Sequence, residues 1–225
     1  FHTLLDHPDL ATADLERVDS LPLSLSIHQA YVGLRGDAAT LGLEDRVDFV
    51  NPSYDFEDEA RALAEGDYRR QGYLLGNHNL ADPEHHPPGR SIVHVSTMTE
   101  GTGWLDLEES EYRERKAELE DYLIGRLEEE IPDVRERIEI CETGTPHTMR
   151  RYSQNPGGAI YGYAHGPTSH SIFRPAPRTS VPGLYLAGAW TFPAAGFSGT
   201  MGSGRHTAKL VMEDVAGAQE AGALR

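Results

Sequence analysis

The first clear element of the chain is an alternation of apolar and polar residues. Leu23, Leu25 and Ile27 alternate with serine and histidine, and apolar residues continue as far as Leu34. A period of two places successive side chains on opposite faces of a strand. The pattern therefore predicts a strand over residues 21–34 that is half buried at its start.

Two other segments have a helical pattern. Phe56 to Ala64 is a short acidic segment that Gly66 ends, which predicts a short helix. From Leu107 to Ile131, apolar residues recur at spacings of three and four, so a longer helix buries one face and exposes glutamates and arginines on the other. Asp106 and Glu109 resemble a capping box at its start. Short apolar runs predict three further strands: Tyr73 to Leu75, Ser91 to Ser96 and Arg137 to Cys141.

Composition and charge exclude several classes of protein. The 225 residues include 20 Lys plus Arg and 36 Asp plus Glu, giving a formal net charge of −16, which repels nucleic acid and anionic membranes. No apolar run approaches the roughly 18 residues of a transmembrane helix. A single cysteine, Cys141, allows neither an internal disulfide nor a thiolate metal cluster, which favours a reducing compartment. We therefore expect a soluble, cytoplasmic protein with no nucleic-acid partner.

The most informative segment begins near Pro182. Leu184 to Ala187 is a short apolar run typical of a buried strand in a parallel sheet, and Gly188 ends it. A loop follows, and the helical pattern resumes at Phe197. An order of strand, glycine loop and helix directs free backbone N–H groups and the positive end of a helix dipole toward an anionic or electron-rich ligand. This segment therefore predicts a cofactor site.

These residues also carry a family resemblance. Val181 to Thr200, VPGLYLAGAWTFPAAGFSGT, resembles the C-terminal FAD-binding signature of the phytoene desaturase, carotenoid isomerase and retinol saturase group, which is related to the amine oxidases. Asp82 to Arg90, Ile92 to Val95 and Arg151 to Gly162 resemble the same family. The resemblance implies an α/β fold: the C-terminal portion of a two-domain, Rossmann-like FAD-binding flavoprotein with a mixed-sheet substrate domain. It assigns residues 1–20 to an N-terminal segment, 21–153 to the substrate domain and 154–225 to the FAD-binding domain.

The resemblance also implies the cofactor contacts. Gly188 and Ala189 would meet the pyrophosphate and ribityl chain of FAD, and backbone N–H groups from Gly196 to Thr200 would approach the flavin ring and stabilise its reduced form. The full predicted set is Gly188, Ala189, Trp190, Gly196, Phe197, Ser198, Gly199 and Thr200. No cysteine or histidine lies in this loop to bind flavin covalently, so we expect noncovalent FAD. The alternative is a tight structural turn without a ligand.

Catalytic residues are harder to assign. Tyr161, Tyr163 and His165 are candidates to line the flavin or a substrate tunnel, where a Tyr or His could exchange a proton; the alternative is that they are aromatic wall residues with no chemical role. Among the histidines, His78, His85 and His86 are closest in sequence. Their spacing favours solvated loop residues, so we predict no metal site.

One expected motif is missing. The sequence has no Gly-x-Gly-x-x-Gly after a strand, and Gly202 to Thr207, which partly copies it, lies within the C-terminal helix pattern. With Phe1 at the first position, this leads us to expect that a complementary N-terminal FAD-binding chain supplies the ADP-binding half. The expected activity is FAD-dependent oxidation, desaturation or isomerisation of a lipophilic small molecule. Two alternatives stay open: an amine or amino-acid oxidase, and a noncatalytic subunit that stabilises a partner flavoprotein.

Overall fold

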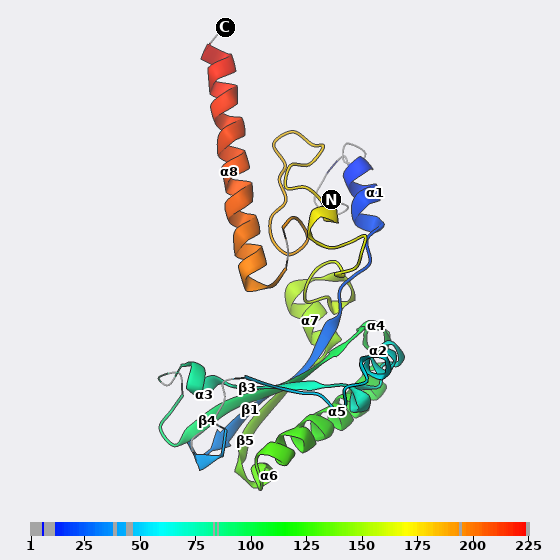
Figure 1. Ribbon diagram of the computed structural model, residues 1–225, viewed down its shortest axis with the longest axis vertical. Coiled ribbons are helices and arrows are strands. Elements are labelled where there is room, and N and C mark those ends of the chain that lie inside the picture. Colours follow the sequence, from blue (N-terminus) through cyan, green and yellow to red (C-terminus); the bar gives the residue numbers. More distant parts are fainter. Residues whose placement is uncertain are drawn as a thin grey trace. The chain divides into compact units, whose positions relative to one another are not determined.

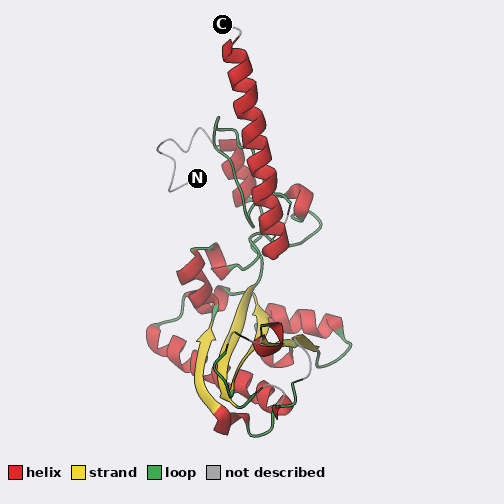
Figure 2. Cartoon of the chain, turned by 90° about the vertical axis from the view of Figure 1, so that its left-hand side faces the viewer, coloured by secondary structure: helices red, strands yellow, loops and turns green. Residues whose placement is uncertain are grey.

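The computed structural model describes Asp6 and residues 12–37, 40–43, 47–82, 84, 86–193 and 195–223. Phe1, His85 and Ala194 lie outside the described residues. The chain divides into two compact units, one formed by Leu25–Ile160 and the other by Phe1–Ser24 together with Tyr161–Arg225. Figure 1 labels the helices and strands, and Figure 2 colours the helices red and the strands yellow.

The unit from Leu25 to Ile160 contains a five-stranded sheet with the order β2-β3-β4-β1-β5. All its pairings are antiparallel. The strands are β1 (Ser26–Arg35), β2 (Val47–Val50), β3 (Tyr73–Asn77), β4 (Arg90–Thr99) and β5 (Ile138–Gly144). An antiparallel sheet agrees with the mixed-sheet domain expected for this part of the chain, whereas the parallel sheet was expected for the FAD-binding part.

Helices of the same unit connect the strands. They are α2 (Phe56–Glu65), α3 (His78–Ala81), α4 (Thr102–Leu105), α5 (Glu109–Glu130), α6 (Val134–Arg137) and α7 (Pro146–Ser153), with short 3-10 turns at Tyr68–Arg70 and Pro156–Gly158. The predicted helix at Phe56 is confirmed: Gly66 ends α2 in the left-handed conformation, at φ 72°, which glycine adopts without steric cost.

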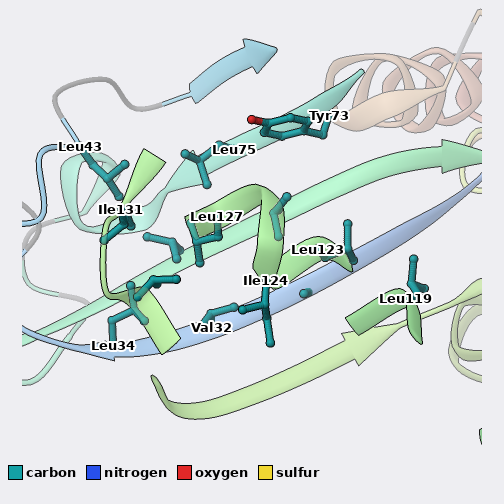
Figure 3. Close-up of a cluster of buried hydrophobic side chains, with 14 of the residues drawn as sticks. Val32, Leu34, Leu43, Tyr73, Leu75, Leu119, Leu123, Ile124, Leu127 and Ile131 are labelled. Carbon is teal, nitrogen blue, oxygen red and sulfur yellow. The ribbon is translucent and has the colours of Figure 1, made fainter. Parts of the chain in front are cut away.

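The core lies between α5 and one face of the sheet. The spacing of Leu119, Leu123 and Leu127 places these fully buried side chains on one stripe of α5, which packs on β1 and β4. Val32 of β1 contributes a buried side chain (Figure 3), and so does Val95 of β4. Fully burying one such side chain contributes about 1.5–3 kcal/mol, so the buried stripe of α5 contributes several kcal/mol to the stability of this unit.

Three details of the secondary structure differ from the predictions. The residue before α5 is Glu108 and makes no side-chain capping bond, so the predicted capping box at Asp106 is wrong. The first strand begins at Ser26 rather than residue 21; before it, Leu23 makes only an isolated bridge to Tyr163. Leu184 to Ala187 form no strand, because Tyr185 makes a single antiparallel bridge to Arg178 and has no second neighbour among the described residues.

The second unit contains few regular elements. They are α1 (Thr12–Asp19), a 3-10 turn at Ser171–Phe173 and the 28-residue helix α8 (Gly196–Ala223). The fingerprint-like stretch from Gly202 to Thr207 lies inside α8, as the sequence pattern indicated. In the described part of the chain, no helix is both long and apolar enough to cross a membrane.

Candidate functional site

The loop that precedes α8 is shaped by Gly188. Its φ is +100°, and no atom lies within 4 Å of the position a Cβ would occupy. Its backbone N–H donates a hydrogen bond to Oγ of Ser203, which is fully buried in α8, at 3.0 Å. This bond ties the loop to the first turns of the helix, and the missing side chain leaves space for a ligand to approach the backbone.

The start of α8 is the second part of the site. The helix begins at Gly196, at φ +76°, and the N–H groups of its first three residues have no partner within the helix. Thr200 turns its hydroxyl back to the Gly196 carbonyl at 2.9 Å, so that side chain does not block the helix end. Phe197 is 92% exposed.

These features fit a flavin cofactor. The open backbone at Gly188 allows close approach. The N–H groups of the first three helical residues, Gly196 to Ser198, have no partner within the helix, and together with the positive helix dipole they suit a group that gains negative charge. The predicted cofactor residues thus gather in two places, the loop at 188–190 and the first turn of α8. Their contacts with FAD stay a prediction.

The candidate aromatic residues are held by a buried arginine that the sequence analysis did not select. Arg174 is 4% exposed and donates to the carbonyls of Tyr161 at 3.3 Å, Tyr163 at 2.8 Å and Ala189. It also contacts the ring nitrogen Nε2 of His165 at 3.0 Å. Burial lowers the pKa of this guanidinium. Arg174 therefore joins the segment 161–165 to the loop at Ala189, and no motif or spacing in the sequence points to this role.

The same junction explains a glycine. Gly162 has φ +73°, and a Cβ there would lie 2.6 Å from the Ala189 carbonyl oxygen. Such a contact is too close for any side chain, so the two backbones meet only because residue 162 is glycine.

Tyr161 and Tyr163 have different surroundings. Tyr163 is buried, its ring meets Trp190 edge-on at 5.0 Å, and burial raises the pKa of its hydroxyl to about 12. It has the properties of a packing residue. Tyr161 is 39% exposed, and its ring lies 4.0 Å from the position of a Cβ on Gly196. Tyr161 is therefore the candidate closest to the helix start.

A second candidate surface belongs to the sheet. The register aligns side chains on the side of the sheet opposite α5, and we call this set the open face: Ile27, Gln29, Tyr31, Arg35, Val47, Phe49, Leu74, Arg90, Ile92, His94, Ser96, Met98, Ile140 and Glu142. Phe49 is 75% exposed and Ile140 59% exposed. From Ile92 to Met98 the open-face positions of β4 carry no charged residue. The middle of the open face, along β4, is thus uncharged and largely apolar, whereas Glu142 lies across from Tyr31 on β5 and Arg35 and Arg90 lie together at one end.

A histidine pair lies on the open face. Nδ1 of His94 is 2.8 Å from Nε2 of His78, and Tyr31 stacks near both rings, with its centroid 5.9 Å from that of His94. His78 begins α3, so its assignment as a solvated loop residue is wrong. The described residues hold no group of three or more His, Cys, Asp or Glu side chains that could bind a metal ion.

A family model described as flavin containing amine oxidoreductase matches residues 49–212, which is most of the chain. The chain belongs to the flavin containing amine oxidoreductase family. The membership confirms the expected relationship to flavoproteins and FAD as the cofactor of the family.

Three curated relatives show which enzymes of this family the chain is similar to. Prolycopene isomerase 1 of an Oncidium hybrid cultivar is 32% identical over 65% of this chain and 26% of its own length. Phytoene desaturase (lycopene-forming) of a Paracoccus strain is 26% identical over 97% of this chain and 43% of its own. All-trans-retinol 13,14-reductase of Danio rerio is 23% identical over 85% of this chain and 35% of its own. The matched region thus spans less than half the length of each of these relatives.

Proposed function

We propose that this chain forms part of an FAD-dependent oxidoreductase or isomerase that acts on carotenoid or retinoid polyenes. The uncharged stretch of the open face along β4, from Ile92 to Met98, is the observation that carries the proposal. A polyene is long, apolar and uncharged, and its binding requires a surface where no charge is desolvated. Ile92 to Met98 extend for about 20 Å at roughly 3.3 Å per residue, which provides such a surface. The names of the relatives support the same substrate class.

In this proposal, the cofactor is held noncovalently by backbone at Gly188, Ala189 and the first turn of α8. FAD supplies the hydride chemistry when it is bound. The chain's own groups fix the position of that backbone: Ser203 holds the Gly188 N–H, and Arg174 holds the Ala189 carbonyl. Tyr161 is the candidate for proton exchange, because it combines exposure with a position beside Gly196.

We also propose that a complementary polypeptide supplies the ADP-binding half of the FAD site. Support comes from the sequence, which lacks a Gly-x-Gly-x-x-Gly between a strand and a helix. Denaturing mass spectrometry of the flavin-containing material should reveal that second polypeptide. Flavin-containing material composed only of this 225-residue chain would contradict this part of the proposal.

The function is tested by an absorption spectrum of the purified protein from 300 to 600 nm, followed by chromatography of a carotenoid or retinoid incubated with it. We expect flavin bands and a product with a changed number or geometry of double bonds. Release of hydrogen peroxide with an amine or amino acid, and no change in the polyene, would favour the oxidase instead. Absence of flavin from the complete assembly would favour a noncatalytic subunit.

A further inference from the structure

Hydrogen-bond donors lie along one exposed side of α7. Residues three and four apart share a face of a helix, and four exposed donors of α7 and its C-cap follow this spacing: His147, Arg150, Arg151 and Gln154. Together with the half-buried Leu105 they line a cavity of about 210 Å³, which we call the donor cavity. Among the described residues that line it, none is acidic.

The two arginines of the donor cavity have no acidic partner, although the chain has a formal net charge of −16. Arginines elsewhere, such as Arg61 and Arg135, pair with carboxylates. Within the described residues, the guanidinium of Arg150 has no hydrogen-bond or ion-pair partner, and that of Arg151 meets only the ring of Tyr152, at 5.6 Å. Unpaired cations beside one cavity attract an anion.

The helix that carries these donors is fixed at its start. Thr145 and Thr148 form a capping box around the first turn of α7. Pro146 is buried there, and Gly158, at φ +66°, lies so close that a Cβ on it would collide with the Pro146 carbonyl. The backbone of α7 is therefore in place before a ligand binds, and only side chains remain to be ordered.

The number of donors favours a phosphate group over a carboxylate. Each guanidinium offers a fork of N–H groups that matches phosphate oxygens in pairs. Gln154 donates one amide hydrogen to the Arg151 carbonyl at 2.8 Å and keeps the other, and the ring of His147 has at least one N–H in either protonation state. A carboxylate has two oxygens to accept these bonds, whereas a phosphate monoester has three and more negative charge.

A larger cavity of about 510 Å³ adjoins the donor cavity, because His147 and Arg151 line both. Its volume is typical of a small-molecule site. Its lining is mixed: Lys116 and two carboxylates, Glu109 and Glu142, lie beside tyrosine rings. The carboxylates would repel a phosphate, so the phosphate belongs in the donor cavity and the rest of a ligand in the larger one.

We propose that His147, Arg150, Arg151 and Gln154 bind the phosphate group of a phosphate monoester whose organic part occupies the larger cavity. The site lies within the unit from Leu25 to Ile160 and shares no residue with the predicted FAD contacts. Soluble phosphate esters and lipid headgroups share this chemistry, and the experiment distinguishes them.

The test is isothermal titration calorimetry of the purified, complete protein in a phosphate-free buffer. The probes are phenyl phosphate, inorganic phosphate and benzoate. Arg150→Gln removes one cation of the donor cavity, and Arg150→Lys keeps the charge without the fork. Arg61→Gln is the matched control, because Arg61 is an exposed arginine of the same unit that is paired with Asp58. Circular dichroism checks that the variants are folded.

We expect saturable binding of phenyl phosphate, tighter than that of inorganic phosphate and of benzoate. Arg150→Gln should weaken it about tenfold, Arg150→Lys should weaken it less, and Arg61→Gln should change it less than twofold. In a second measurement, the protein is sedimented with phosphatidylcholine vesicles with and without phosphatidic acid. Sedimentation that requires phosphatidic acid and Arg150 would identify a lipid headgroup as the source of the phosphate, and its absence a soluble ester.

Three results would overturn the inference. The first is no saturable binding of phenyl phosphate together with no sedimentation on phosphatidic acid. The second is an equal loss in Arg150→Gln and Arg61→Gln, which would show a general effect of charge. The third is benzoate binding as tight as that of phenyl phosphate. None of these results bears on the proposed function, which is measured by flavin absorbance and polyene products.

Discussion

Arg174 donates a hydrogen bond of 2.8 Å from its buried guanidinium to the backbone carbonyl of Tyr163. The same side chain also donates to the carbonyls of Tyr161 and Ala189. One cation therefore satisfies backbone acceptors from two segments that otherwise lack regular secondary structure. Such a charge is tolerated in the interior only while its partners are present.

Replacing this arginine should loosen the whole junction. Arg174→Met keeps an unbranched side chain but leaves three carbonyls without their donor, so we expect a loss of about 3 kcal/mol. Urea unfolding of the purified protein measures the loss, and amide hydrogen exchange over residues 161–165 locates it. Arg205→Met, at an exposed position of α8, should change stability by less than about 0.5 kcal/mol. Similar values for both variants would contradict the role assigned to Arg174.

The sequence predicted the unit from Leu25 to Ile160 better than the second unit. The Leu119, Leu123 and Leu127 spacing identifies α5 because a helix period is a local property. By contrast, Leu184 to Ala187 satisfy the pattern of a buried parallel strand, yet a strand forms only with neighbours, and the described residues provide one bridge at Tyr185. A local pattern cannot supply the missing partners.

The residues of the candidate site were also predicted only in part, because a local pattern does not show which segments meet in the fold. Glycines at 188 and 196 were identified because a family signature contains them, and both have positive φ. Arg174 and the pair of His78 and His94 were missed, because their roles depend on segments that approach only in the folded chain. His78 and His94 are 16 residues apart, and no spacing rule for helices or strands connects them.

Gly188 should be intolerant of any side chain. Its φ of +100° disfavours other residues, although space exists for a Cβ. We expect Gly188→Ala to lower flavin content at least severalfold, because the backbone leaves the conformation that the cofactor loop requires. The ratio of absorbance at 450 nm to that at 280 nm measures it. Retention of full flavin content would show that this loop does not need its present conformation.

Gly217, in α8, should tolerate a side chain, unlike Gly188. It lies in the helix interior, and nothing occupies the space within 4 Å of a Cβ there. Alanine has a higher helix propensity than glycine, so Gly217→Ala should stabilise the helix by up to about 1 kcal/mol without changing flavin content. Thermal unfolding checks the first effect and absorbance the second. A lower melting temperature would show that residue 217 contacts something outside the described residues.

Gly76 and His94 should behave as a coupled pair. Gly76→Ala places a methyl group where the His94 ring lies, so we expect a loss of about 1–3 kcal/mol from overpacking. In the double variant with His94→Ala the ring is gone, and the added methyl group should cost much less. The coupling energy from the four unfolding free energies should exceed about 1 kcal/mol. Additive effects would mean that the ring moves away from Gly76 at little cost.

His28 should make stability depend on pH. It is 1% exposed, its Nδ1 has no partner, and its ring lies 4.8 Å from that of Trp104. Burial, with a smaller contribution from the positive charge of Arg115, lowers its pKa from 6.5 to about 3. The unfolded chain therefore binds a proton below pH 6.5 that the folded chain does not bind until about pH 3, so stability falls as pH falls through this window. At pH 5 the neutral, buried His28 therefore lowers the free energy of unfolding by about 2 kcal/mol.

His28→Leu removes the titrating group. Between pH 7 and pH 5, the unfolding free energy of this variant should fall by about 2 kcal/mol less than that of the unaltered protein. Parallel pH profiles for the two proteins would show that His28 is protonated in the folded state or reaches solvent there.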